Sequence, residues 1–276
     1  MGIFLLPNSF LLMLSKRIKL YQVDAFTDKL FKGNPAAVCI LDQWIDEDLM
    51  QNIAAENNLS ETAFVLKKNN RYEIRWFTPE AEVDLCGHAT LATAHVLYEH
   101  FALDQSTIQF YSHRSGNLFV SQNDDTLSLD FPTDESEMVE TPVDLIDAFG
   151  LKPIESYRGK TDYALMFPDQ DFIEKCEPDF NILKRSNVRG VMITAPGKEV
   201  DFVSRFFAPG VGIDEDPVTG SAHTTLTRIW GMKLGKNVLR AKQLSKRGGQ
   251  LICEYKGDRT IISGKAVTYL VGEIWV

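Results

Sequence analysis

The sequence predicts an α+β fold built from two similar domains, in each of which strands surround one central helix. The first observation is an internal repeat, because three short motifs recur in the same order at offsets of 130 and 133 residues. The second is a helical segment in each copy that begins at a glycine. The third is a series of β-rich segments around both helices. The matched motifs are RWFTP and RFFAP at 75–79 and 205–209, GHA and GSA at 87–89 and 220–222, and SHRSGNL and SKRGGQL at 112–118 and 245–251.

The first copy predicts two helices among its strands. Asp46 is a suitable N-cap for a helix that carries apolar residues at helical spacing and ends near Asn57 and Asn58. The second helix, over 87–100, has small or apolar residues on nearly every side, so we expect it to be buried. Strands are predicted over 18–24, 36–41, 62–67, 72–77, 107–111, 117–121 and 126–131.

The second copy predicts the same order of elements after an acidic, proline-bounded connection at 132–142. We therefore divide the chain into an N-terminal domain, residues 13–131, and a C-terminal domain, residues 132–265, with a final strand at 266–276 that packs back on the first. The elements predicted in the second copy are strands over 163–167, 190–195, 201–207, 250–255 and 260–263 and a helix from Gly220 to about Trp230.

The composition excludes several classes of protein. A net charge of −9 and a pI near 5.1 argue against binding to nucleic acid or to an anionic membrane, since both require basic surface. The four cysteines are scattered and form no metal-binding or disulfide pattern, which fits a reducing cytoplasm. The apolar first fifteen residues lack the basic segment and cleavage site of a signal peptide and are too short to span a bilayer, so we expect Met13 to be the native start.

Glu61 is the leading candidate for an acid/base residue. It lies at the mouth of the apolar strand predicted from Thr62, where a carboxylate can take and return a proton away from bulk water. The alternative is a solvated glutamate in a loop between helix and strand.

The starts of the two glycine-entered helices supply the other candidates. His88 follows Gly87 and could donate to a substrate, although it could also be a core histidine. In the second copy Asp216 and Ser221 flank Gly220, so we expect them to face His88 across a cleft. Free backbone N–H groups at two such helix starts bind a carboxylate without lysine or arginine. The sequence therefore predicts a small carboxylated substrate held by Gly87, Gly220 and Ser221.

No cofactor or metal is predicted. Gly210 and Gly212 follow a strand, but Glu215 stands where a dinucleotide fingerprint needs its third glycine, and no phosphate-binding loop is present. His88 and His95 have no metal-ligand spacing with a nearby acid.

Taken together, the motifs resemble the PhzF, phenazine biosynthesis-like, family from about residue 18 to the C-terminus. The motifs that carry the resemblance are VDAFT at 23–27, GNPAAV at 33–38, LSETAF at 59–64, FTP at 77–79, EVDLCGHAT at 82–90, DPVTGSA at 216–222 and QLSKRGG at 243–249. The resemblance implies two pseudo-symmetric diaminopimelate-epimerase-like domains, each a barrel-like mixed β-sheet around a central helix. It further implies a cofactor-independent isomerase in which Glu61 moves the proton, helped by His88, Asp216 and Ser221, and it implies a homodimer.

Two other functions are compatible with this resemblance. Related racemases use two cysteines, one in each repeat, but here Cys86 is matched by Thr219. A one-thiol amino-acid epimerase using Cys86 therefore stays open, as does a catalytically inactive small-molecule-binding protein of the same fold. The substrate and pathway cannot be read from the sequence.

Overall fold

The computed structural model describes residues 16–276. The interpretation of the first fifteen residues, including the expected start at Met13, falls outside the described residues. No helix in this part of the chain is long and apolar enough to cross a membrane.

The first repeat is a mixed sheet wrapped around helix α2 (Gly87–Phe101). Strand β2 runs parallel to β3, β3 antiparallel to β4, and β4 parallel to β6, after which β6, β7 and β8 form an antiparallel meander. Helix α1 (Glu47–Asn57) connects β2 to β3 and begins at Asp46, whose side chain accepts from the backbone of Asp48. The strands are β1 (Arg17–Ala25), β2 (Asn34–Leu41), β3 (Glu61–Lys68), β4 (Arg71–Phe77), β5 (Glu82–Val83), β6 (Thr107–Ser112), β7 (Gly116–Asn123) and β8 (Thr126–Pro132).

The second repeat has the same pairing scheme around helix α6 (Gly220–Leu234). Strand β11 runs parallel to β12, β12 antiparallel to β13, and β13 parallel to β15, followed by the meander of β15, β16 and β17. Its strands are β9 (Glu137–Met138), β10 (Glu155–Arg158), β11 (Tyr163–Met166), β12 (Val191–Pro196), β13 (Phe202–Ala208), β14 (Ile213–Asp216), β15 (Val238–Gln243), β16 (Gly249–Tyr255) and β17 (Arg259–Gly264). The remaining helices are α3 (Val143–Phe149), α4 (Gln170–Lys175), α5 (Phe180–Arg185) and the 3₁₀ turn η2 (Pro209–Val211).

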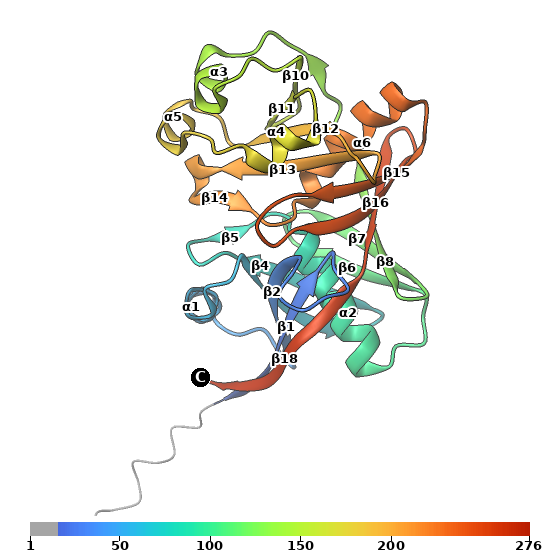
Figure 1. Cartoon of the computed structure of the whole chain (residues 1–276). Coiled ribbons are helices and arrows are strands. Elements are labelled where there is room, and N and C mark those ends of the chain that lie inside the picture. The colour runs from blue at the N-terminus through green and yellow to red at the C-terminus, as the bar shows by residue number, and fades with distance from the viewer. Residues whose placement is uncertain (1–15) are drawn as a thin grey trace, which may run out of the picture.

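The two repeats are joined by exchanged strands. β8 pairs with β17 across the middle of the molecule, where the two sheets meet. Strand β18 (Ala266–Trp275) then runs down the first repeat and pairs with β1, as Figure 1 shows, while β9 pairs with β10 in the second repeat. Each sheet is therefore completed by a strand that follows the last meander strand of the other repeat.

Buried apolar side chains explain why each sheet wraps around its helix. Ten of the fifteen residues of α2 are buried, including Leu91 and Leu97, and α6 is buried to a similar extent with Leu226 and Trp230. Their side chains belong to one core that continues through both repeats. Smaller cores lie under α1 and beneath α3, α4 and α5. The expected α+β class and the central buried helices are thus confirmed.

Several boundaries differ from the sequence predictions. Helix α6 continues to Leu234, one turn beyond the expected end near Trp230, and ends at Gly235 in the left-handed conformation. The connection at 132–142 contains the two-residue strand β9. The other unpredicted elements are short or polar, which leaves little periodic signal. They are α3, α4, α5, η2, β5, β10, β14 and β15.

Candidate functional site

Glu61 and His88 come from different elements that meet at one end of the strands of the first sheet. Helix α1 ends at Asn58 in the left-handed conformation, and Glu61 is the first residue of β3. His88 is in the first turn of α2, and α2 packs against β2 and β3. Parallel pairing places Glu61 beside Ala36, two residues after Asn34. The two candidates therefore lie at the same end of the sheet although 27 residues separate them.

The Glu61 and His88 side chains form a close, nearly buried pair. Oε2 of Glu61 and Nε2 of His88 are 3.1 Å apart, and the side chains are 13% and 7% exposed. The contact is short enough for an ion pair, but it lacks the alignment of a full hydrogen bond, and neither atom has another hydrogen-bond partner within the described residues. Buried polar atoms in native proteins normally have such a partner, and each exception asks for an explanation. These two atoms are positioned to meet a third polar group.

Cys86 approaches the other side of the His88 ring. Its Sγ is 3.5 Å from Nδ1 of His88. Burial raises the pKa of the Cys86 thiol to about 11, so the thiol is uncharged near neutral pH. Burial alone would lower the pKa of His88, but Cys86 and Glu61 outweigh it and raise that pKa well above its usual value. Since the thiol is neutral, we attribute the proton on His88 to the charge of Glu61.

Asp216 enters the site from the second repeat. It ends β14, and its Oδ1 accepts a 2.8 Å hydrogen bond from Nδ2 of Asn34 in β2. Its Oδ2 accepts from the Thr219 hydroxyl at 2.5 Å. Burial raises the pKa of Asp216 to about 6, against the opposing effects of His88 and of the two hydrogen bonds. Asp216 can therefore change its protonation state near neutral pH.

The starts of α2 and α6 meet at the centre of the molecule. A Cβ on Gly220 would lie 4.0 Å from Cα of Gly87, so side chains at these two positions would crowd the contact. Neither N-cap residue, Cys86 or Thr219, caps its helix with its side chain. Two positive helix ends with uncapped N–H groups therefore converge beside Glu61, His88 and Asp216, which favours binding of an anion.

The structure brings together five of the six residues that the sequence predicted for the site. The exception is Ser221, whose side chain is exposed to solvent. It lies in the first turn of α6, at the position that matches His88 in the first repeat. The other two acids beside Asp216 face away from the site, since Glu215 pairs with Arg205 and Asp214 with Lys184.

Sequence reasoning overlooked two polar residues that hold the site together. Asn34 has no predicted role beyond its place in the GNPAAV motif, yet it is fully buried and contacts His88 and Asp216. Gln243, at the end of β15, accepts from the backbone N–H of Thr219 and donates to the carbonyl of Asp216. Asn34 and Gln243 both lie inside motifs that carry the resemblance to the PhzF family, so those motifs could have drawn attention to them.

The same cluster contains the three kinds of atom that bind transition metals. The sequence showed no acid near His88, but the fold places ligand atoms of Glu61, Cys86 and His88 within 4.8 Å of one another. An imidazole binds an ion through one nitrogen, whereas here the carboxylate and the thiol approach different nitrogens of the ring. This arrangement suits ion pairing and proton transfer better than a shared ion.

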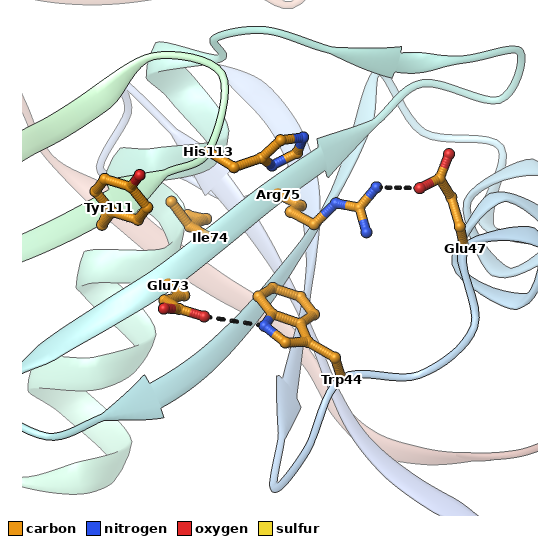
Figure 2. Close-up of a pocket in the computed structure, with 7 residues that line it drawn as sticks. All are labelled: Trp44, Glu47, Glu73, Ile74, Arg75, Tyr111 and His113. Atoms are coloured by element: carbon orange, nitrogen blue, oxygen red, sulfur yellow. Dashed lines mark hydrogen bonds and ion pairs between the residues drawn. The ribbon is translucent and has the colours of Figure 1, made fainter.

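A separate cavity of about 330 Å³ lies on the outer side of the first sheet. Figure 2 shows Trp44 and Tyr111 along its walls, with Glu73 bonded to Trp44 and Arg75 bonded to Glu47. Arg75 also forms a two-fold ion pair with Glu82. The second repeat has the matching pair of Arg205 and Glu215, 130 and 133 residues later. Because its carboxylates and its arginine already have partners, this cavity fits a structural role in the repeat.

Comparison with known proteins identifies the family of the chain. The family model described as PhzC-PhzF, phenazine biosynthesis-like protein, matches residues 23–272. The chain belongs to this family. An uncharacterized isomerase of Pseudomonas aeruginosa is 49% identical over 257 residues, which are 93% of this chain and 98% of that protein. The crystal structure of a PhzF family protein from Enterococcus faecalis is 46% identical, with a TM-score of 0.92 over 95% of this chain and 100% of that one.

The fold extends beyond the family. A hydroxyproline epimerase from Agrobacterium vitis shares it with a TM-score of 0.61 over 94% of this chain and 93% of that one, at 11% sequence identity. The expected relation to epimerase-like folds is therefore confirmed at the level of architecture.

Proposed function

We propose that the protein is an isomerase that moves a proton within a small unsaturated carboxylic or amino acid, with Glu61 as the general acid and base. Relatives of about half identical sequence are named as isomerases, which supports the reaction class. The observation that carries the proposal is the buried pair of Glu61 and His88, whose facing atoms are 3.1 Å apart and lack hydrogen bonds. It lies where two uncapped helix starts converge.

The proposed reaction needs one base. The N–H groups at Gly87 and Gly220 hold the substrate carboxylate, which directs its adjacent carbon toward Glu61. The Glu61 carboxylate removes a proton from that carbon, and the electron pair left behind spreads over the conjugated system. The protonated Glu61, whose acidic hydrogen exchanges with solvent, then delivers a proton to another carbon of that system, which restores both the enzyme and the charge. His88, as a cation, stabilises the negative charge that builds up between the two steps.

Asp216 completes the proposed site from the second repeat. With its pKa near 6 it is ionised in most molecules at neutral pH and can bind an amino or hydroxyl group of the substrate. Ser221, exposed at the start of α6, is positioned to contact the part of the substrate nearer to solvent. No step of this reaction transfers electrons to an acceptor, so the proposal requires no cofactor.

The thiol epimerase is the less favoured alternative. A thiol whose pKa is about 11 is a weak source of thiolate near neutral pH, and Thr219 occupies the position of a second thiol. A catalytically inactive binding protein would use the same helix starts and the same buried pair to hold a ligand, but relatives of about half identical sequence are named as isomerases, which favours catalysis.

Proton NMR in D₂O tests the proposal without assuming a product. Wild type and Glu61→Gln are incubated with a panel of small unsaturated amino and hydroxy carboxylic acids. We expect deuterium incorporation or double-bond migration in wild type, and a rate lower by about 10²–10⁴ in the variant, the usual value of one acid/base group. Glu56→Gln, which changes an exposed glutamate of α1, is the matched control. Equal turnover in wild type and Glu61→Gln would exclude Glu61 as the base.

The homodimer and the cytoplasmic location belong to the same proposal. The acidic net charge of −9 supports a protein without nucleic-acid or membrane partners. Light scattering on the purified chain measures the mass of the assembly directly, and a mass of 31.2 kDa would contradict the dimer.

A further inference from the structure

Asn34 is a buried amide at the meeting point of the two repeats. It begins β2, directly after Gly33, whose N–H donates to the carbonyl of Gly248 and whose carbonyl accepts from Arg247. The second repeat thus fixes the backbone next to Asn34. The side chain is fully buried and points to partners in both repeats.

The amide nitrogen of Asn34 has more acceptors than hydrogens. Nδ2 lies 2.8 Å from Oδ1 of Asp216, 2.9 Å from the carbonyl oxygen of Val218 and 3.2 Å from Nδ1 of His88. An amide NH₂ group carries two hydrogens, and a backbone carbonyl can only accept. The two shorter contacts, both to the second repeat, take these hydrogens. Nδ1 of His88 therefore receives none.

A ring nitrogen that accepts no hydrogen bond here is best satisfied by carrying its own proton. Cys86 Sγ, 3.5 Å away, is a weak acceptor for that proton. The charged groups that face the ring are Glu61 at Nε2 and Asp216 on the far side of Asn34. Both are carboxylates, so both favour the cationic ring, in agreement with the raised pKa of His88.

We propose that Asn34 is a positioning residue that commits both amide hydrogens to the second repeat, which keeps Asp216 ionised and leaves His88 protonated on both ring nitrogens. The Glu61–His88 pair of one repeat is thereby coupled to Asp216 of the other. The catalytic meaning of this assignment rests on the proposed function, whereas the protonation states themselves do not.

NMR titration of the carboxyl and imidazole groups tests the assignment. Protein labelled with ¹³C in its aspartates and ¹⁵N in its histidines is titrated as wild type, Asn34→Ala, Asn34→Leu and Asn52→Ala. The Asp216→Asn and His88→Gln variants assign the two signals. Alanine and leucine both remove the donor, but leucine fills the space and alanine does not. Asn52 is an exposed asparagine of α1 and serves as the control.

We expect His88 of wild type to carry a proton on both ring nitrogens at neutral pH, a measurement that needs no variant to fold. Loss of one hydrogen bond to a charged group should move the Asp216 midpoint upward by about one to two pH units in both Asn34 variants. The His88 midpoint should fall in the same variants, because Asp216 is then neutral over a wider pH range and supports the cationic ring less. Asn52→Ala should leave both midpoints in place.

Three results would overturn the assignment: a singly protonated His88 in wild type, an unmoved Asp216 midpoint in both variants, or a shift in Asn34→Ala that Asn34→Leu reverses. The last result would mean that Asn34 acts only by filling space. Failure of the isomerase proposal gives a different pattern, in which Glu61→Gln retains turnover while the titrations behave as described.

Discussion

His223 makes the stability of the second repeat sensitive to acid. It is fully buried in α6, where its Nδ1 lies 2.7 Å from the carbonyl of Thr219 and its Nε2 lies 3.4 Å from the hydroxyl of Ser204. A carbonyl only accepts, so Nδ1 carries the hydrogen and Nε2 accepts from Ser204. This neutral ring is satisfied on both sides, and a second proton would put a charge into the core beside Phe202.

The size and sign of the effect follow from the pKa. Burial lowers the pKa of His223 to about 4, despite the hydrogen bond to Thr219, while an unfolded histidine has a pKa of about 6.5. The unfolded state therefore binds more protons between these values. The stabilising contribution of the neutral ring is complete above about pH 6.5 and is lost as the pH falls toward 4. A difference of about 2.5 units corresponds to about 3 kcal/mol.

Urea denaturation between about pH 7.5 and pH 4 measures this contribution. Asp216 has the opposite effect, because its raised pKa makes the folded state bind more protons below about pH 6. The contribution of His223 is therefore measured as the difference between wild type and His223→Gln in the pH dependence of the free energy of unfolding. We expect wild type to lose about 3 kcal/mol more than the variant over this range. His100→Gln, at an exposed position of α2, is the control. Parallel curves for wild type and His223→Gln would refute the reasoning.

Two further predictions concern a glycine and a thiol. Gly33→Ala should lower the free energy of unfolding by about 2–3 kcal/mol, because φ is +65° and the added Cβ would overlap the carbonyl oxygen of Ala25. The control Gly116→Ala, where φ is +74° and the added Cβ meets open space, should lower it by only about 1 kcal/mol. Equal urea midpoints for the two variants would contradict the steric argument. Cys86→Ala should reduce deuterium exchange by less than about tenfold, far less than Glu61→Gln, because the thiol is neutral. The reverse order of effects would favour the thiol epimerase.

Motifs that are local in the sequence predicted much of this protein. The duplication was visible because the same short motifs open the same elements twice, and Figure 1 shows the two resulting halves. The buried central helices were predictable because a helix that is apolar on all sides is stable only when other apolar groups shield every side of it from water. Glu61 and His88 could be named because a carboxylate before an apolar strand and a histidine at a helix start are local features. Short elements such as β14 escaped prediction because four residues carry little periodicity.

The contacts between the repeats were decided only by the tertiary structure. Asn34 meets Asp216 and Val218, which lie 182 and 184 residues further along the chain. No spacing rule connects residues so far apart, since strand pairing and the packing of two helix starts determine their distance. The sequence determined which polar groups were available at these helix starts. Folding decided which of these groups contact one another and which carry a charge, because burial and hydrogen-bond partners from the other repeat shift their pKa values.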